Sequence, residues 1–156
     1  MEQQQTTIRT TSEDADFRNL IQLLDEELAL RDGDLHPFYA RFNRLEGIRH
    51  VVVFYSDGAP VGCGALRQFD DDTVAIKRMF VRAEFRGKGI GAEILKELES
   101  WAAELGYSES ILETGKKQPE AIRLYQKSGY ETIPNFGQYA NTENSTCMKK
   151  RITDIA

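Results

Sequence analysis

The segment from residue 86 to residue 92 has the composition of a phosphate-binding loop. It consists of Arg86, Gly87, Lys88, Gly89, Ile90, Gly91 and Ala92, and it precedes a stretch with helical periodicity. The first amides of a helix lack an acceptor inside the helix, and glycines let the backbone approach a phosphate closely. Arg82, Arg86 and Lys88 add positive charge to a chain whose net charge is -5. We therefore expect a polyanion here, against the alternative of a tight glycine turn with solvated basic side chains.

Two other phosphate motifs compete with this interpretation. The P-loop order Gly-x-x-x-x-Gly-Lys-Ser/Thr does not occur. Gly87, Gly89 and Ala92 do satisfy the loose dinucleotide pattern, and Glu113 follows at about the distance of a ribose-binding acid. A dinucleotide fold places its motif after the first strand of a sheet built from repeated βαβ units, whereas a predicted meander precedes this loop. The order of elements therefore argues against a nicotinamide cofactor.

An antiparallel meander is predicted ahead of the loop. A short first strand over 6–10 is followed by a helix with apolar residues from Phe17 to Leu28 and by a second helix over 37–45. Strands over 51–55 and 61–69 are separated by a turn over 56–60 that contains Gly58 and Pro60. A third meander strand is predicted over 73–81.

A βαβ unit is predicted after the loop. Apolar residues recur at helical spacing up to Leu105, and Gly106 ends that helix as a C-cap. A strand over 110–114, a helix that begins at Pro119 and ends at Gly129, and strands over 130–133 and 145–149 complete the order.

The third meander strand changes phase near its middle. Val74 and Ile76 share one parity, whereas Met79 and Val81 have the other. One inserted residue at position 77 or 78 would reverse the faces, as a β-bulge does. A bulge breaks the ladder locally and leaves backbone amides free for a ligand. The other interpretation is an imperfect strand with two apolar sides.

Composition restricts the class of protein. The 156 residues, 40% of them hydrophobic, predict a single domain over 1–156. An excess of 25 acidic over 20 basic side chains does not support general nucleic-acid binding. Two cysteines, no leader-like start and no long apolar stretch favour a cytoplasmic protein without a membrane span. His36 and His50 lie far from any cysteine pair at ligand spacing, so no metal is expected.

The complete order of elements resembles the GNAT superfamily of acetyl-CoA-dependent N-acyltransferases, over about the whole chain and most strongly between Lys77 and Tyr130. The superfamily's phosphate loop, Gln/Arg-x-x-Gly-x-Gly/Ala, matches residues 86–91, and its Ala-x-x-Leu-Tyr-x-x-x-Gly-Phe/Tyr signature matches residues 121–130. The resemblance implies an α/β fold with a mixed sheet, in which an antiparallel meander precedes a βαβ unit with splayed central strands. It also implies direct transfer of acetyl from acetyl-CoA to a primary amine.

The resemblance further implies how the cofactor would be held. Backbone amides of residues 86–92 would bind the CoA pyrophosphate. Main-chain groups of Met79, Phe80 and Val81 would pair with pantetheine like an added strand, and the bulge would direct an amide at the thioester carbonyl. The Asn that commonly precedes the short helix is replaced by Gln118, whose amide can make similar hydrogen bonds.

Tyr125 and Glu113 are the catalytic residues that the resemblance implies. Tyr125 matches the Leu-Tyr position, and its phenol would protonate the CoA sulfur; the alternative is a packed aromatic side chain. Glu113 matches a glutamate that some members use to acetylate protein N-termini, as a base through water or to position the amine. A carboxylate with a pKa of about 4.3 is a weak base for an ammonium, so burial or a water chain is needed. The alternative for Glu113 is a salt bridge with Lys116 or Lys117.

Other residues depart from the family pattern or remain open. The bulged strand carries Lys77 and none of the carboxylates that many members have there. Cys63 has no histidine partner and is predicted to be core. Tyr139 either lines the acceptor cleft or packs on the core. An acidic set either attracts a cationic amine or forms a solvated helix face, the interpretation that we favour: Asp25, Glu26, Glu27, Asp32 and Asp34.

The sequence leaves the acceptor and its partners open. The expected partners are acetyl-CoA and an amine acceptor, with no nucleic acid and no membrane, and a homodimer is compatible with the sequence. A non-catalytic acyl-CoA-binding regulatory module is the main alternative function. NAD-dependent oxidoreduction is a third.

Overall fold

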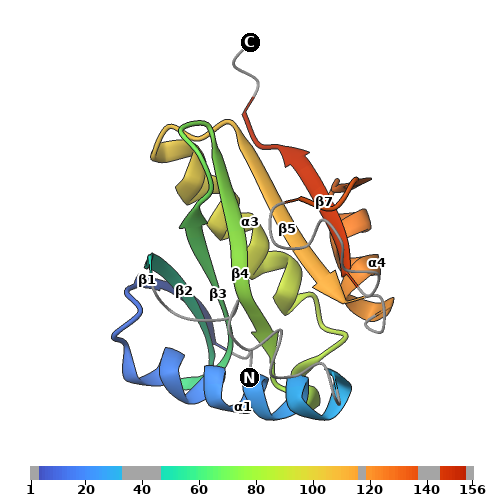
Figure 1. Cartoon of the computed structure of the whole chain (residues 1–156). Coiled ribbons are helices and arrows are strands. Elements are labelled where there is room, and N and C mark those ends of the chain that lie inside the picture. The colour runs from blue at the N-terminus through green and yellow to red at the C-terminus, as the bar shows by residue number, and fades with distance from the viewer. Residues whose placement is uncertain (1–3, 33–46, 116–118, 137–144, 154–156) are drawn as a thin grey trace.

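The computed structural model describes residues 4–32, 47–115, 119–136 and 145–153, which form a seven-stranded sheet with helices on both faces. The mixed α/β architecture expected from the sequence is confirmed (Figure 1). In chain order the elements are β1 (Gln5–Thr10), α1 (Ala15–Asp32), β2 (Ile48–Ser56), β3 (Ala59–Gln68), β4 (Thr73–Val81), the 3-10 helix η2 (Ala83–Phe85), α3 (Ile90–Glu104), β5 (Glu109–Gly115), α4 (Pro119–Lys127), β6 (Glu131–Ile133) and β7 (Ser145–Arg151).

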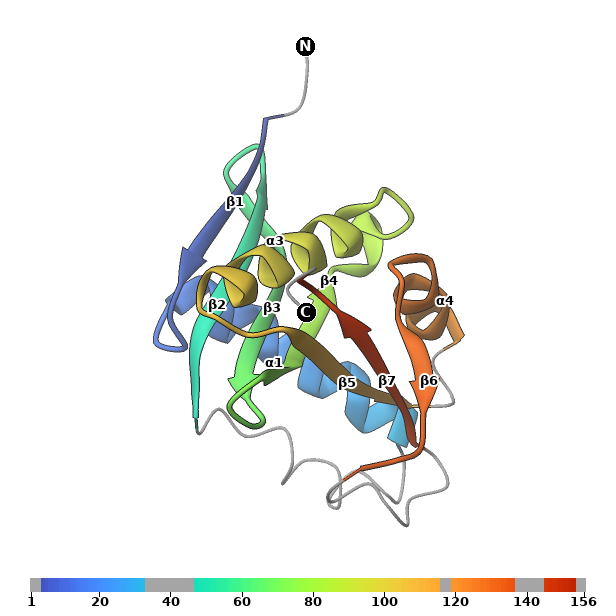
Figure 2. The same cartoon turned by 90° about the horizontal axis from the view of Figure 1, so that it is seen from above.

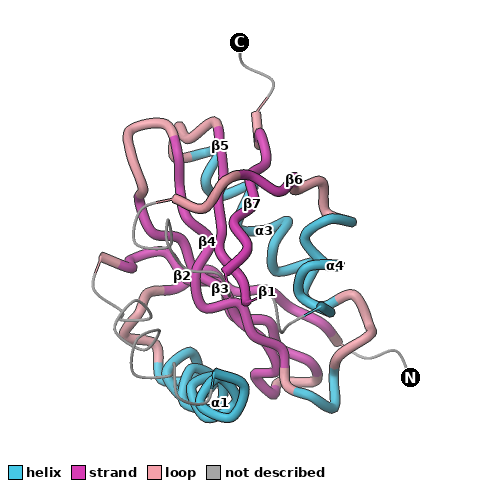
Figure 3. Tube along the Cα trace, turned by 45° about the vertical axis from the view of Figure 1, so that its right-hand side comes forward, coloured by secondary structure: helices cyan, strands magenta, loops and turns pink. Residues whose placement is uncertain are grey.

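Two apolar cores, one on each face of the sheet, hold the helices in place. On one face, Ile94 and Leu98 of α3 pack with residues of the sheet and with Tyr125 of α4. On the other face, Phe17 and Leu20 of α1 pack against β2 and β3. Figure 2 and Figure 3 show α1 on the side of the sheet away from α3 and α4. The sheet is therefore the middle layer of three.

The sheet opens in its centre. Its strand order is β1-β2-β3-β4-β5-β7-β6, and β4 with β5 is its one parallel pair among the described strands. That pair joins only Thr73, Val74 and Ala75 to β5, and the two strands then diverge (Figure 1). The splayed centre agrees with the resemblance, and a sheet with a single parallel pair does not have the repeated βαβ topology of a dinucleotide fold.

The predicted bulge on β4 is confirmed. Lys77 and Phe80 keep their pairing with β3, so Arg78 and Met79 together oppose the single residue Gly64. Arg78 has a positive φ of 58°. A Cβ on Gly64 would lie 2.6 Å from the Met79 sulfur, so the close packing over the bulge requires glycine.

The turn between β2 and β3 is shorter than the sequence predicted. Only Asp57 and Gly58 separate the strands, with φ values of 50° and 83°, which is typical of the primed two-residue hairpins that match strand twist. Pro60, which the prediction placed in the turn, pairs with Tyr55 at an irregularity in the ladder. A bulge is one of the few sheet positions that tolerate proline.

The remaining boundaries shift by a few residues. The predicted strand over 130–133 begins at Glu131, and the last strand extends to Arg151. Leu105, predicted on the apolar face of α3, is the C-cap of that helix and is 44% exposed. The second predicted helix, over 37–45, and Tyr139 lie outside the described residues. Among the helices that the structure describes, none has the length and apolar content needed to cross a membrane.

Candidate active site

A cleft of about 600 Å³ runs from the open centre of the sheet to the glycine loop. Its walls come from α1, from the bulged end of β4, from the loop with the first turn of α3, and from α4. Figure 2 shows the loop end of α3 close to α4. Ten of the predicted site residues line the cleft: Met79, Phe80, Val81, Arg86, Gly87, Gly89, Ile90, Gly91, Ala92 and Tyr125. Lys88 and Glu113 are not among its lining residues, and Gln118 lies outside the described part of the chain.

The glycine loop presents backbone to the cleft. Gly87 and Gly89 have φ values of 80° and 82°, and Gly89 is the N-cap of α3 with no side-chain hydrogen bond. Glu93 donates the first intrahelical hydrogen bond, to Gly89 O, so the amides between them have no acceptor within the helix. These amides and the positive end of the helix dipole suit an anion.

Gly91 sets the width of the cleft. A Cβ at this position would lie 3.1 Å from Leu124 Cδ2, so the absence of a side chain lets α4 approach the first turn of α3. The third glycine of the loop therefore serves helix packing, whereas the first two serve backbone conformation.

The local positive field expected around the loop is only partly present. Arg86 donates from Nη1 and Nη2 to the two carboxylate oxygens of Glu27 at 2.9 and 2.6 Å. These hydrogen bonds raise the pKa of Arg86 above its ordinary value. Arg82 Nη1 lies 3.8 Å from Glu84 Oε1, and Lys88 Nζ lies 5.4 Å from the centre of the Phe85 ring. Two of the three predicted cations thus have an acid beside them.

The edge of β4 that faces β5, beyond the point where the two strands diverge, is the second backbone surface in the cleft. Arg82 donates its amide to Val61 O of β3, and alternation along an antiparallel strand directs the amide and carbonyl of Val81 to the other side. Arg86 Nε donates to that carbonyl at 2.8 Å. The Val81 acceptor therefore already has an intramolecular donor.

Tyr125 brings a buried phenol to the cleft. It is 6% exposed, and its ring packs edge-on against Tyr130 with the centroids 5.9 Å apart. Burial, followed by the negative charge of Glu113, raises the pKa of Tyr125 above its ordinary value. The phenol consequently keeps its proton at neutral pH and is a donor.

Glu113 lies on the opposite face of β5 from Leu112, whose side chain belongs to the core under α3. Its charge raises the pKa of Lys77, although burial, as the larger effect, lowers that pKa overall. Sequence reasoning treated Lys77 only as the place of a missing acid and did not pair it with Glu113. The lysines predicted to pair with Glu113 lie outside the described residues.

The acidic set on α1 does not form a simple solvated face. Asp25 accepts a hydrogen bond from Arg78 Nη2 at 2.7 Å, and Glu27 holds Arg86. Both acids therefore connect α1 to residues of the cleft region. The side chain of Asp32 and all of Asp34 lie outside the described residues.

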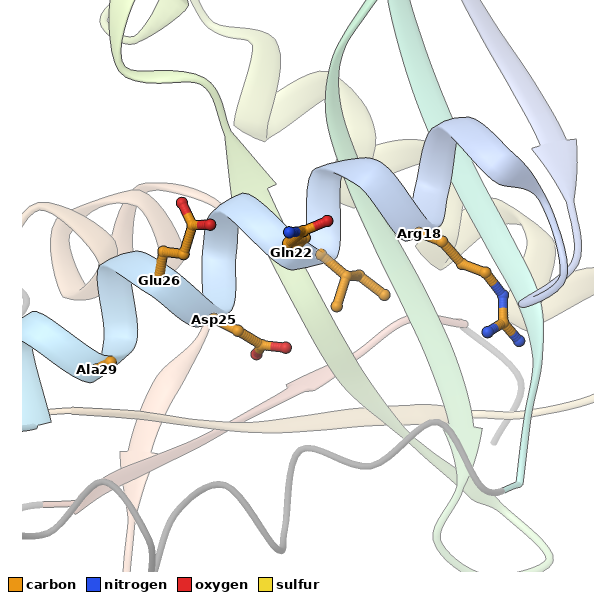
Figure 4. Close-up of a pocket in the computed structure, with 6 residues that line it drawn as sticks. Arg18, Gln22, Asp25, Glu26 and Ala29 are labelled. Atoms are coloured by element: carbon orange, nitrogen blue, oxygen red, sulfur yellow. The ribbon is translucent and has the colours of Figure 1, made fainter.

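A second hollow, of about 530 Å³, lies along α1, where Figure 4 shows Arg18, Gln22, Asp25 and Ala29 in succession. Asp25 is therefore both a wall of this hollow and the partner of Arg78. Sequence reasoning did not select Arg78 as a functional residue; the signal was a basic residue at the phase slip of β4.

Cys63 is a core residue, as predicted. It is 0% exposed, and burial raises its pKa to about 12. Its thiol donates to Arg78 O at 3.4 Å, below the bulge. Among the described residues, no group of His, Cys, Asp and Glu is arranged to hold a metal ion.

Known proteins with similar sequences are acetyltransferases. Residues 16–130 match the family described as Acetyltransferase (GNAT) family. The chain is 33% identical over 149 residues to an "IAA acetyltransferase" of Azospirillum brasilense, covering 90% of this chain and 96% of that protein.

Solved structures share the fold over nearly the full length. A candidate acyl-CoA N-acyltransferase of Klebsiella pneumoniae has a TM-score of 0.80 and 29% identity, covering 96% of this chain and 98% of that one. A GNAT family acetyltransferase of Elizabethkingia anophelis with acetyl-CoA bound has a TM-score of 0.68 and 18% identity, covering 94% and 97%. The family match and the full-length relative together show that this chain belongs to the GNAT family of acetyltransferases.

Proposed function

We propose that the cleft of about 600 Å³ binds acetyl-CoA and that the enzyme transfers the acetyl group directly to a primary amine. The observation that carries the proposal is the meeting, in one cleft, of the open edge of β4, the glycine loop and the phenol of Tyr125. The Elizabethkingia anophelis protein of the same fold has acetyl-CoA bound, which supports this choice of donor.

The loop would hold the CoA pyrophosphate through backbone amides. Gly87 and Gly89 have no atom within 4 Å of a Cβ built on them, so this face of the loop is open to a ligand. Phosphate at this position would receive hydrogen bonds from the first turn of α3 and would complement the helix dipole. It would also compete with Glu27 for Arg86.

The pantetheine arm would lie along β4 in the opening between β4 and β5. Val81 directs its amide and carbonyl there, and hydrogen bonds to both would extend the sheet by one strand-like segment. Arg86 must first release Val81 O. The arm would then end beside the bulge, next to Met79.

Direct transfer needs an acid and a base. The amine nitrogen bonds to the acetyl carbonyl carbon, the carbon–sulfur bond breaks, and the electron pair leaves on sulfur. Tyr125, which its raised pKa keeps protonated at neutral pH, would give its proton to that sulfur and regain one from solvent.

Glu113 is our proposed acceptor of the proton that the amine loses, through water, since it does not line the cleft. Burial lowers the pKa of its neighbour Lys77, so that this ammonium loses its proton more easily than that of an exposed lysine.

A thermal melt with acetyl-CoA, CoA or NAD tests the donor. Ligand at 100 times its dissociation constant adds about 2.7 kcal/mol of stability, which at about 2–4 °C per kcal/mol is a rise of roughly 5 to 11 °C for a chain of this size. We expect a rise with acetyl-CoA and CoA and none with NAD. Thiol release during incubation with amines then tests turnover. Binding without release from any amine would instead indicate the non-catalytic acyl-CoA-binding module.

We extend the proposal to the whole chain as one domain over 1–156. Two buried cysteines without a disulfide, Cys63 and Cys147, fit a reducing compartment such as the cytoplasm. A homodimer stays a prediction, which the mass of the native protein in solution would test.

A further inference from the structure

Arg78 is a buried cation with unused hydrogen-bond donors. Only 2% of its side chain is exposed. Its Nη2 donates to Asp25, whereas Nε and Nη1 have no hydrogen-bond partner within the described part of the chain. A buried charged donor without an acceptor is costly, so native proteins rarely keep one unless something else supplies the acceptor. A guanidinium is a planar fork that matches a carboxylate.

The position of Arg78 relates it to the reaction. Arg78 and Met79 form the bulge of β4, and Met79 lines the cleft that we assign to acetyl-CoA. The guanidinium reaches the opposite face of the sheet, where it meets Asp25 at the wall of the hollow along α1. Arg78 lines neither cavity, but its backbone belongs to the bulge at the reacting end of the cleft and its guanidinium contacts an acid that lines the second hollow.

The electrostatics of this face of the sheet also favour an anion. Burial is the main cause that lowers the pKa of Lys77, the charge of Glu113 raises it, and the positive charges of Arg67 and Arg78 lower it further. The side chains of Arg67, Lys77 and Arg78 are therefore close enough to interact electrostatically. A bound carboxylate would stabilise the charged forms of all three side chains.

We propose that Arg78 binds a carboxylate of the acceptor through Nε and Nη1, so that the acceptors are free amino acids or similar amino-carboxylates. This inference rests on the acetyltransferase function proposed above. A carboxylate at Arg78 places the α-amine of such a molecule only a few bonds away, beside the bulge. The first residue of a peptide has no free α-carboxylate and would lack this contact.

Paired acceptors test the substrate class. A panel of free amino acids is compared with the corresponding amides at equal concentrations of unprotonated amine, with thiol release as the readout. We expect kcat/KM for the acid to exceed that for its amide by about ten- to a hundredfold, the value of a hydrogen-bonded charged contact. Amides or simple amines that react as well as the acids would overturn the inference.

Four variants connect the preference to Arg78. Arg78→Gln should remove the preference for acids, and Arg78→Lys should retain part of it through charge alone. Asp25→Asn removes the competing negative charge and should lower KM for the acids. Arg49→Gln removes an exposed arginine of β2 and should leave the preference unchanged. An unchanged preference in Arg78→Gln would refute the assignment.

A binding experiment covers the case in which Arg78→Gln does not fold or no acceptor reacts. The Nε–H resonance of Arg78 in the CoA-saturated wild type, assigned with Arg78→Lys, is followed by NMR during titration with N-acetylglycine and with N-acetylglycinamide. The acid alone should produce a saturable shift. No shift with the acid would overturn the inference even if acetyl-CoA binds, whereas failure to bind acetyl-CoA or CoA would overturn the proposed function itself.

Discussion

Arg86 of the glycine loop and Glu27 of α1 are joined by a two-point ion pair across the mouth of the cleft, with N–O distances of 2.9 and 2.6 Å. The same guanidinium donates to Val81 O, so one side chain links α1, the loop and β4. Phosphate would compete with Glu27 for the guanidinium of Arg86, and pantetheine would compete with Arg86 for Val81 O. Cofactor binding therefore has to exchange these contacts.

Glu27→Gln should increase the affinity for acetyl-CoA. The change removes a negative charge beside the proposed phosphate site and weakens the ion pair with Arg86. A partly exposed pair of this kind contributes up to about 1 kcal/mol, or roughly a fivefold change in Kd. Calorimetric titration at low salt measures it. Glu104→Gln, which disrupts the Arg9 pair on the other side of the molecule, is the matched control and should not alter Kd. A higher Kd for acetyl-CoA in Glu27→Gln would show instead that the Glu27–Arg86 pair stabilises the acetyl-CoA complex.

Gly89→Glu should abolish tight acetyl-CoA binding, because it adds a negative charge beside the amides that we propose bind phosphate. Gly58 provides the control: its φ of 83° and the open space around it match those of Gly89, but it lies in the β2–β3 turn. A left-handed residue with a Cβ costs about 1–2 kcal/mol, so both Glu variants should lower Tm by similar amounts. Only Gly89→Glu should lose acetyl-CoA affinity, and an equal affinity in the two variants would reject the loop assignment.

Tyr125→Phe should lower kcat by about a hundredfold or more while leaving the Kd for acetyl-CoA nearly unchanged, because it removes a proton donor and keeps the ring. Tyr130→Phe is the matched control. Its phenol is also buried but bonds to Ser110 at 2.8 Å, so its removal should cost about 1 kcal/mol of stability with little effect on kcat. The rate of acetyl transfer in a single turnover is measured for the wild type and for both variants. Equal kcat values for wild type and Tyr125→Phe would leave Tyr125 a packing residue.

His50 should make the fold more stable at neutral than at acidic pH. Burial and the nearby charge of Arg49 lower the pKa of His50 in the folded state below 6.5. The unfolded chain then binds more protons, so the stabilisation is complete above pH 6.5 and is lost as the pH falls through the folded pKa. Urea unfolding between pH 7.5 and pH 5, in wild type and His50→Phe, should show a weaker pH dependence in the variant. Identical slopes would mean that His50 titrates normally.

Local signals predicted much of the fold and of the cleft. The phase slip at residues 77–78 revealed the bulge, and Gly87 and Gly89 of the loop occupy positive-φ positions where a Cβ is unfavourable. Contacts between distant parts of the chain could not be predicted in this way. Arg86 and Glu27 are 59 positions apart, and nothing in the neighbourhood of either indicates which acid opposes which base. The contact of Arg78 with Asp25, 53 positions away, could not be predicted for the same reason.

The order of strands has a consequence for biosynthesis. β7 is the last described strand, yet it lies between β5 and β6 and pairs with both (Figure 2). While the ribosome is still adding Ser145–Arg151, β6 has no neighbour within the described sheet and β5 has an open edge. The first four strands and α1 can collapse cotranslationally, but the half of the domain that carries α4 has to wait for the last strand to leave the exit tunnel. A nascent chain stalled before β7 would thus keep an exposed strand edge for chaperones to recognise.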